Sequence, residues 1–176
     1  MPDAAPGGTL KGRIAERQKE VERAAAFYLR YPNSAVARLE LGILRYNQHR
    51  LEEAINEYRL AIQLDSKLAF PHHNLGNVFY DQGKSEEAIS EYRRGIQLDP
   101  KDALPHISLG IALSEQGKSE EAISEYRRAI ALSPEFAFAH YGLGNALRDQ
   151  GKSGEAISEY RLSIKLDPQN SVLTRI

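Results

Sequence analysis

The chain has 176 residues, of which 41% are hydrophobic, so it can bury the core of at least one domain. Its 23 basic and 24 acidic residues leave a formal net charge of −1, which argues against nucleic acid, a partner that selects a basic face. The absence of cysteine excludes disulfides and thiol catalysis. We see no signal peptide and no apolar run that could span a membrane, so we expect a cytoplasmic protein without membrane insertion.

The chain begins with a short segment that we expect to be a disordered leader, because residues 1–9 are small, polar and rich in proline and glycine. From Leu10 onward, apolar residues recur at helical spacing until Pro32 and Asn33 break the pattern. This pattern predicts a helix within residues 10–34.

A unit of 34 residues then runs through the chain four times. Residues 82–94 read Gln-Gly-Lys-Ser-Glu-Glu-Ala-Ile-Ser-Glu-Tyr-Arg-Arg, and residues 116–128 repeat them letter for letter. A fixed period of this length predicts a stack of similar modules, each of which contacts its neighbours. The four units are best framed as residues 35–68, 69–102, 103–136 and 137–170, which leaves residues 171–176 as a C-terminal tail.

Each unit contains two amphipathic helical patterns, as the second unit illustrates. Its first pattern ends at Gly83, since glycine readily takes the left-handed conformation that closes a helix. Ser85 is the expected N-cap of the second pattern, which Asp99 and Pro100 end because a residue before proline avoids helical geometry. Gly95 lies inside that second helix, and we expect alanine there to stabilise the fold. The predicted fold class is all-α.

The spacing of small, aromatic and proline residues in these units resembles the tetratricopeptide repeat family. The matching residues of the second unit are Leu75-Gly76, Ala88, Tyr92 and Pro100. The third and fourth units repeat the pattern, and the first unit lacks only the final proline. The resemblance covers about residues 35–170 and implies a right-handed superhelical α-solenoid of four helix-turn-helix repeats, with the helix before them as an N-terminal cap.

A column of histidines occupies the fourth place of the second, third and fourth units, at His72, His106 and His140, where the first unit has Arg38. Packed helices lie about 8–10 Å apart, whereas zinc ligands must each come within about 2 Å of one ion. One histidine per unit therefore cannot converge on a metal, and we interpret the column as partly buried side chains. The chain also lacks a Gly-x-Ser-x-Gly motif and a phosphate-binding glycine loop, so we predict no catalytic, cofactor or metal site.

The surface predicted to bind a partner is lined by the first helix of each unit, because these helices line the concave side in the family that the sequence resembles. One of their faces is apolar and aromatic with amides in between, which suits an extended peptide or an amphipathic helix. The alternative is that some of these side chains only pack against neighbouring helices. The residues expected in this peptide-binding groove are Leu39, Ile43, Phe70, His73, Asn74, Asn77, Tyr80, Leu104, Ile107, Ile111, Phe138, Tyr141, Asn145 and Arg148.

Two groups of known repeats sharpen this expectation. Repeats that hold the C-terminal carboxylate of chaperones use Lys, Asn and Arg from three consecutive first helices, and only Asn77 has the matching type here. The sequence therefore does not predict an adaptor for chaperone tails. Asn74 resembles the asparagines of repeat domains that grip a peptide backbone, since an amide both donates and accepts hydrogen bonds, but the later units lack this asparagine.

The C-terminal end of the stack is a second candidate interface. The second helix of each unit should be covered by the next unit, and only residues 171–176 follow the fourth unit. Part of its apolar face is therefore expected to lie open, and open apolar surface of this kind commonly marks an interface. The residues of this possible C-terminal interface are Ile157, Tyr160, Ile164 and Leu166.

These features predict a non-catalytic scaffold or adaptor that binds a partly apolar peptide or helix in its concave groove. The expected partner is a protein or peptide and not nucleic acid. One alternative is a structural module that forms homo-oligomers through its groove or its open C-terminal end. Another is a recruiting segment of a larger enzyme whose chemistry lies elsewhere.

Overall fold

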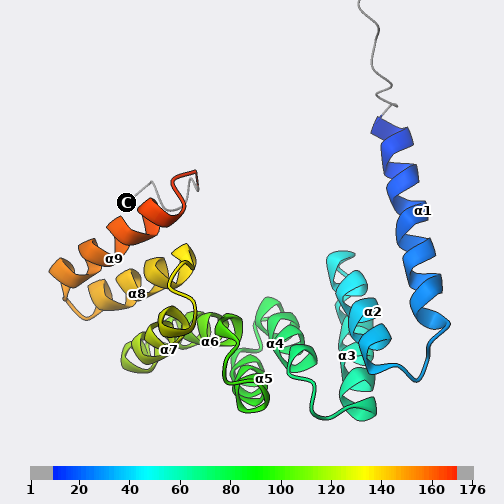
Figure 1. Ribbon diagram of the computed structural model, residues 1–176, viewed down its shortest axis with the longest axis horizontal. Coiled ribbons are helices and arrows are strands. Elements are labelled where there is room, and N and C mark those ends of the chain that lie inside the picture. The colour runs from blue at the N-terminus through cyan, green and yellow to red at the C-terminus, as the bar shows by residue number, and fades with distance from the viewer. Residues whose placement is uncertain (1–9, 170–176) are drawn as a thin grey trace, which may run out of the picture. The chain divides into compact units, whose positions relative to one another are not determined.

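The computed structural model describes residues 10–169, which form nine α-helices and no strand within that range (Figure 1). The all-α prediction is confirmed for these residues. The chain divides into two compact units, Met1–Ser66 and Lys67–Ile176. The predicted leader, residues 1–9, and the predicted tail, residues 171–176, lie outside the described residues.

The described part of the first unit, residues 10–66, contains three helices. They are α1 (Leu10–Leu29), α2 (Ala35–Asn47) and α3 (Leu51–Leu64). Helix α2 packs against both α1 and α3. Ser34 caps α2, because its hydroxyl oxygen accepts a hydrogen bond from the Ala37 backbone N–H at 3.2 Å. The buried residues Leu41 and Tyr58 join α2 and α3 in one small core.

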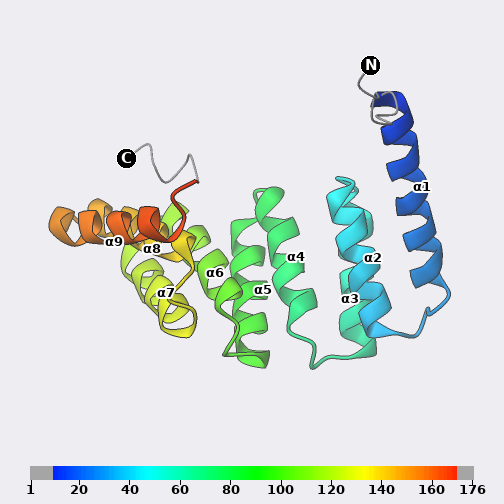
Figure 2. The same cartoon turned by 45° about the horizontal axis from the view of Figure 1, so that its top comes forward.

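The second unit contains three pairs of helices within residues 67–169. They are α4 (Phe70–Asp81) with α5 (Ser85–Leu98), α6 (Ala103–Glu115) with α7 (Ser119–Leu132), and α8 (Ala137–Asp149) with α9 (Ser153–Leu166). Each pair packs against the next, through α5 on α6 and α7 on α8, as Figure 2 shows from another side. The pairs therefore build a helical repeat solenoid, in which each module contacts only its neighbours.

The turn inside each pair has the same left-handed residue. Gly83, Gly117 and Gly151 have φ angles of 72°, 73° and 76°. In the first unit His49 takes this place with a φ angle of 58°, an angle that residues with a Cβ adopt less readily than glycine does. The same turn therefore forms in the first unit, although glycine is missing there.

The predicted N-cap at Ser85 is wrong. Helix α5 begins at Ser85 itself, and its N-cap, Lys84, makes no side-chain capping hydrogen bond. The reason lies in the preceding turn, where the Lys84 backbone N–H donates to the carbonyl of Phe79 at 2.8 Å and closes α4. This bond fixes the backbone at Lys84, one residue before Ser85. Helix α5 therefore begins without a hydrogen bond from a capping side chain.

The Leu-Gly pairs of the sequence are explained by close packing between glycine and tyrosine. A Cβ atom at Gly76 would lie 2.5 Å from the ring of Tyr92, and one at Gly144 would lie 2.5 Å from the ring of Tyr160. The ring of Tyr126 is approached by two glycines, Gly110 of its own pair and Gly142 of the next. The tyrosine of each second helix therefore lies against the backbone of a first helix, where a larger residue would not fit.

Candidate functional site

The first helices of the second unit form the inner side of its stack. Helix α4 approaches α6, and α6 approaches α8, whereas α5, α7 and α9 have no Cα atoms within 8 Å of one another among the described residues. A stack curves toward the side on which its helices are closer. The inner face is therefore formed by exposed and half-buried residues of the first helices, namely Phe70, Asn74, Asn77, Tyr80, Leu104, Ser108, Ile111, Phe138, Tyr141, Asn145 and Arg148.

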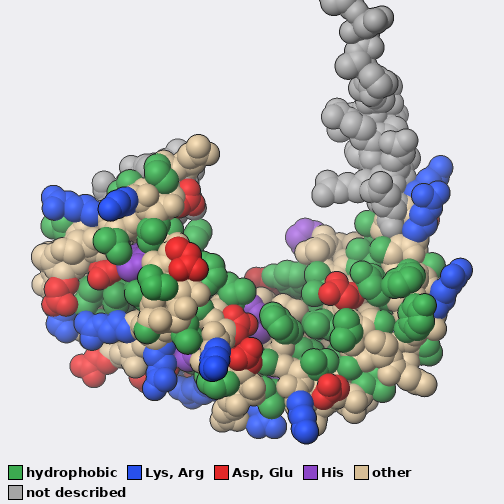
Figure 3. Space-filling view, viewed as in Figure 1, with side chains coloured by type: hydrophobic (Ala, Val, Ile, Leu, Met, Phe, Trp, Pro, Cys, Tyr) green, Lys and Arg blue, Asp and Glu red, His purple; other side chains and the backbone are tan. Residues whose placement is uncertain are grey.

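An apolar ladder runs along the inner face, with one side chain from each first helix. Phe70, Leu104 and Phe138 hold the same place in successive repeats and are 52%, 43% and 51% exposed. The ring of Phe138 meets Tyr141 edge-on, with centroids 6.5 Å apart. Hydrophobic side chains also reach the surface elsewhere, among charged ones (Figure 3). The ladder differs from such scattered exposure because its members recur in register, which offers a ligand several apolar contacts in a row.

Two amides on the inner face are oriented from behind by tyrosines. The Tyr92 hydroxyl donates to Oδ1 of Asn77 at 3.0 Å, and the Tyr160 hydroxyl donates to Oδ1 of Asn145 at 2.9 Å. Because Oδ1 accepts these bonds, the amide N–H groups are the part of each side chain that can donate to a peptide carbonyl. Ile111 takes the corresponding place on α6, so amide, apolar and amide side chains follow one another along the stack.

A small cavity of about 130 Å³ opens on the inner face between α4 and α6. The residues that line it are Asn77, Tyr80, Tyr92, Ser108 and Ile111. The cavity therefore combines an aromatic and aliphatic wall with amide and hydroxyl groups, a combination that holds a side chain and its adjoining backbone.

Tyr80 links the two helices beside this cavity. Its hydroxyl donates a hydrogen bond to the Glu115 carboxylate of α6. Burial and this carboxylate raise the pKa of Tyr80 to about 12, so the hydroxyl remains protonated at neutral pH. The bond holds the first helices of adjacent repeats together at the inner face.

Three of the predicted groove residues are buried, which contradicts the expectation that they face a ligand. Ile107 is only 8% exposed, because α6 is contacted by four other helices and has little free surface. His73 is buried beside the ring of Tyr92, and its Nε2 lies 3.1 Å from the Ser108 hydroxyl oxygen. Burial lowers the pKa of His73, so its neutral form is favoured. Leu39 is buried in the first unit.

The remaining predicted groove residue of the first unit is Ile43, which is half-buried on α2. Leu39 and Ile43 therefore belong to the core and surface of the first unit and are not part of the inner face of the second. Asn74 and Arg148 lie on first helices of the second unit, and they are half-buried and exposed respectively.

The C-terminal end differs from the interior of the stack at one isoleucine. Ile89 and Ile123 are 2% and 6% exposed, whereas the equivalent Ile157 is 49% exposed. The reason is that α6 packs on α5 and α8 packs on α7, while no described helix packs on α9 from the far side. Part of the predicted interface is therefore open.

The other predicted interface residues behave differently. Tyr160 is buried against Gly144, and Ile164 is half-buried. Leu166 is 39% exposed, about as much as its equivalent Leu132 at 38%, so its exposure is not specific to the end of the stack. Sequence reasoning missed Leu162, which is 46% exposed where the two preceding repeats have arginine, and that departure from the repeat was the signal.

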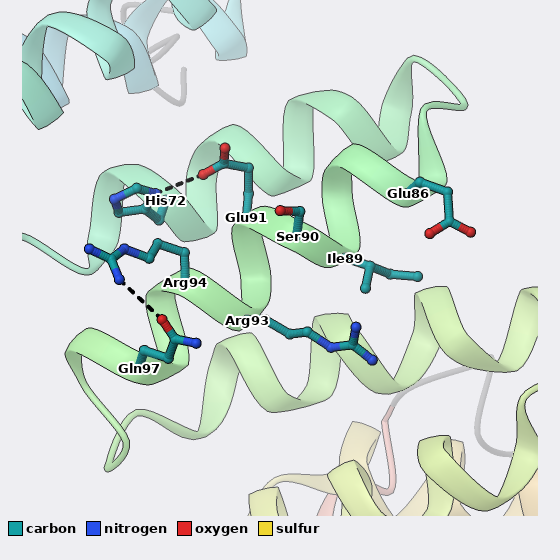
Figure 4. A pocket seen from close by; sticks show the side chains of 8 residues that line it. All are labelled: His72, Glu86, Ile89, Ser90, Glu91, Arg93, Arg94 and Gln97. Carbon is teal, nitrogen blue, oxygen red and sulfur yellow. Dashed lines mark hydrogen bonds and ion pairs between the residues drawn. The ribbon is translucent and has the colours of Figure 1, made fainter.

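Each histidine of the column binds a carboxylate of its own repeat. Nδ1 of His72 lies 2.7 Å from Oε2 of Glu91, as Figure 4 shows, and His106 and His140 make the same contact. Within residues 10–169, no group of three or more His, Asp or Glu side chains is arranged to hold a metal ion. Each histidine therefore links the first helix of its repeat to the second helix through its contact with glutamate.

Figure 4 also shows the outer cavity of about 470 Å³ that borders the His72–Glu91 pair, with Arg94 bonded to Gln97 beside it. Most of its lining residues come from α5 and are polar or charged.

In the part of the chain that the structure describes, no helix is both long and apolar enough to cross a membrane.

Comparisons with known proteins agree with the repeat pattern. A family model described as TPR repeat matches residues 42–83 and 76–117, and one described as Tetratricopeptide repeat matches residues 107–171. Together these matches span most of the chain. A search of curated proteins finds no match.

Several solved structures share the fold. The crystal structure of YrrB, described as a TPR protein with an unusual peptide-binding site, has a TM-score of 0.72 and 21% identity, and the match covers 92% of this chain and 85% of that chain. A crystal structure of MamA has a TM-score of 0.76 and 20% identity, covering 97% of this chain and 99% of that chain. At these identities the likeness concerns the fold alone.

Proposed function

The chain belongs to the tetratricopeptide repeat family and is a protein-interaction scaffold, and we propose that the inner face of its second unit binds an extended, partly apolar peptide. The proposal assigns no catalytic step to the chain. The observation that supports it best is the apolar ladder of Phe70, Leu104 and Phe138, which are exposed in register on consecutive first helices.

The spacing of the ladder favours an extended peptide. Packed helices lie about 8–10 Å apart, so the ladder offers one apolar contact over each such interval. A polyproline-type chain rises about 3.1 Å per residue and about 9 Å over three residues. Such a peptide would place an apolar side chain against each member of the ladder if every third residue were apolar.

The oriented amides support the same kind of ligand. A peptide bound in extended form exposes carbonyl groups that need donors once water is excluded. Asn77 and Asn145 can supply their amide N–H groups from two repeats apart, without reading the side chains of the peptide. The likeness to YrrB, described as having an unusual peptide-binding site, is consistent with this use of the fold.

Synthetic peptides test the proposal directly. We expect the full chain to bind a peptide of about ten residues with leucine at every third position, with a dissociation constant in the micromolar range because ordering costs offset much of the burial. A peptide of the same composition, with its leucines two residues apart instead of three, should bind at least about tenfold more weakly, since its side chains miss the ladder. The measurement is fluorescence anisotropy. Equal binding of the two peptides would refute the spacing argument.

Variants of the ladder identify the surface. Replacing Phe70 and Phe138 with alanine should weaken binding by about tenfold or more, because each ring loses part of the roughly 1.5–3 kcal/mol of a buried apolar side chain. The matched control is Leu132→Ala, an exposed leucine on α7 away from the inner face. Circular dichroism should show unchanged helicity in both variants. If the ladder variant binds as well as the control, the inner face is not the site.

A second candidate function is self-association through the end of α9, which the exposure of Ile157 favours. The positive charge of Arg161 also favours self-association. Its equivalents, Arg93 and Arg127, contact Glu121 and Glu155 of the next repeat at 3.1 and 3.9 Å. A second copy of the chain carries glutamates of the same kind in the first turns of its second helices.

Sedimentation velocity at micromolar concentration tests this candidate. We expect the wild-type chain to show a concentration-dependent dimer, and Ile157→Glu to shift it to the monomer, because a charge on the apolar end opposes its burial. Leu132→Glu, on the outer side of α7, is the matched control and should leave the dimer intact. A wild-type chain that stays monomeric throughout would exclude self-association.

A further inference from the structure

The cavity between α4 and α6 lies on a different row of the inner face from the apolar ladder. Its lining residue Asn77 follows Phe70 by seven residues on α4. Ile111 likewise follows Leu104 by seven residues on α6. Since a helix rises about 1.5 Å per residue, the cavity lies about 10 Å from the ladder along both helices. A peptide on the ladder therefore reaches the cavity only with a long side chain.

The walls of the cavity suit the apolar stem of such a side chain. Tyr80 and Tyr92 supply aromatic rings, and Ile111 supplies an aliphatic surface. The Tyr92 hydroxyl donates to Asn77 and the Tyr80 hydroxyl donates to Glu115, so both rings are held at their tips. The described residues that line the cavity include no lysine, arginine, aspartate or glutamate. A charged end of the ligand side chain would therefore find its partner at the rim and not inside.

Glu115 supplies a carboxylate at this rim. Its side chain is exposed, and it accepts a hydrogen bond from Tyr80, which belongs to the cavity wall. A carboxylate has about four acceptor sites, and the tyrosine occupies one of them. Among the side chains that the structure describes, no lysine, arginine or histidine forms an ion pair with Glu115. The carboxylate can therefore accept further hydrogen bonds from a cationic group.

The next gap along the stack, between α6 and α8, shows what such a carboxylate binds. Asp149 takes the place of Glu115 one repeat later. Its Oδ1 lies 3.1 Å from Nη2 of Arg148, so the chain supplies its own arginine to the acid at that gap. Helix α6 has Ser114 in the place of Arg148, and the carboxylate of Glu115 receives no such partner from its own helix.

We propose that the cavity between α4 and α6 binds an arginine side chain of the peptide, with its stem against the rings of Tyr80 and Tyr92 and its guanidinium at Glu115. The inference rests on the proposed function, because the peptide must lie along the ladder. Arginine fits better than lysine, since a guanidinium stacks on aromatic faces and can donate two parallel hydrogen bonds to a carboxylate. The arginine would also fix the register of the peptide, which a ladder of regular spacing cannot do alone.

The place of the arginine in the peptide follows from the ladder. A polyproline-type chain has three residues per turn, so every third side chain faces the ladder and the two between them point elsewhere. The cavity belongs to the same two helices as Phe70 and Leu104. The arginine is therefore expected at one of the two positions between the leucines that contact these residues.

A series of peptides tests the proposal with the full chain, by fluorescence anisotropy. Each peptide carries three leucines, three residues apart, and one arginine that is moved in turn through the positions between them. Norleucine at the same position is the reference, because it has an apolar stem and no charge. At one position arginine should bind about fivefold more tightly than norleucine, the effect of a partly exposed ion pair joined to an aromatic contact. Norleucine that binds as well as arginine at every position would overturn the inference and leave the proposed function standing.

Glu115→Gln identifies the contact. The glutamine can still accept the Tyr80 hydroxyl but has no charge, so the advantage of arginine should disappear while the norleucine peptide binds as before. Glu87→Gln, which removes the same charge from an exposed place on α5, is the matched control and should keep the advantage. An advantage of arginine that survives Glu115→Gln also contradicts the inference. If no peptide of the series binds, the proposed function fails and this inference fails with it.

Discussion

Ile123→Glu is expected to destabilise the fold by about 4 kcal/mol or more, whereas the same change at Ile157 should leave the fold nearly as stable as wild type. The two isoleucines have the same local sequence, Glu-Ala-Ile-Ser-Glu-Tyr-Arg. Ile123 is buried under α8, so the substitution would place an unpaired charge in an apolar contact. Ile157 is 49% exposed, and a carboxylate there stays hydrated.

Urea unfolding followed by circular dichroism measures the two changes. A loss of about 4 kcal/mol is a large part of the 5–15 kcal/mol that stabilises an ordinary domain, so the Ile123 variant should unfold at a much lower urea concentration than wild type. Ile89→Glu should behave like Ile123→Glu, since Ile89 is equally buried. If Ile157→Glu costs as much as Ile123→Glu at a concentration where the chain is monomeric, the end of α9 is covered and the second candidate function loses its support.

Gly142→Ala is expected to destabilise the fold by about 1–3 kcal/mol, although alanine is the better helix former. A Cβ atom at Gly142 would lie 2.5 Å from the ring of Tyr126 in the preceding repeat. The ring has little room to move, because a Cβ at Gly110 would lie 2.8 Å from it as well. The added methyl group would therefore push α8 away from α7, and thermal unfolding should show a lower midpoint.

Gly95→Ala is the matched control, with the opposite expected sign. A Cβ atom at Gly95 would meet its nearest neighbour, the Ala69 carbonyl oxygen, at 3.5 Å, an ordinary contact. The gain in helix propensity, up to about 1 kcal/mol, should therefore raise the midpoint. A lower midpoint for Gly95→Ala would show that this helix contact is tighter than its geometry indicates.

The sequence was sufficient to predict the helices, their pairing and the family. The unit occurs four times, so each helix and turn is predicted from four copies of the sequence. Where one copy departs from the pattern, as at His49 in place of glycine, the other three copies still predict the turn. The interaction role followed from the family. The start of α5 was misjudged by one residue, because the backbone of the preceding turn, and not a serine side chain, fixes where the helix begins.

The candidate site depended more on tertiary structure. Helical spacing placed Phe70, Ile107 and Tyr141 on one predicted face, but α6 packs against four helices and α4 and α8 against fewer, so Ile107 is buried while Phe70 is exposed. Periodicity describes a helix in isolation and does not show how many neighbours it has. The bond between Tyr80 and Glu115 was equally invisible, since it joins side chains 35 residues apart.

The sequence by itself determined what each repeat is, because helix propensity, turn glycines and the apolar stripe are local properties that recur every 34 residues. Only the tertiary structure decided which residues of each copy are buried and which are exposed. Ile123 and Ile157 share their neighbours in sequence, and one is core while the other is surface. The physical reason is that burial depends on what packs against a side chain from outside its own repeat, and that differs between the middle of a stack and its end.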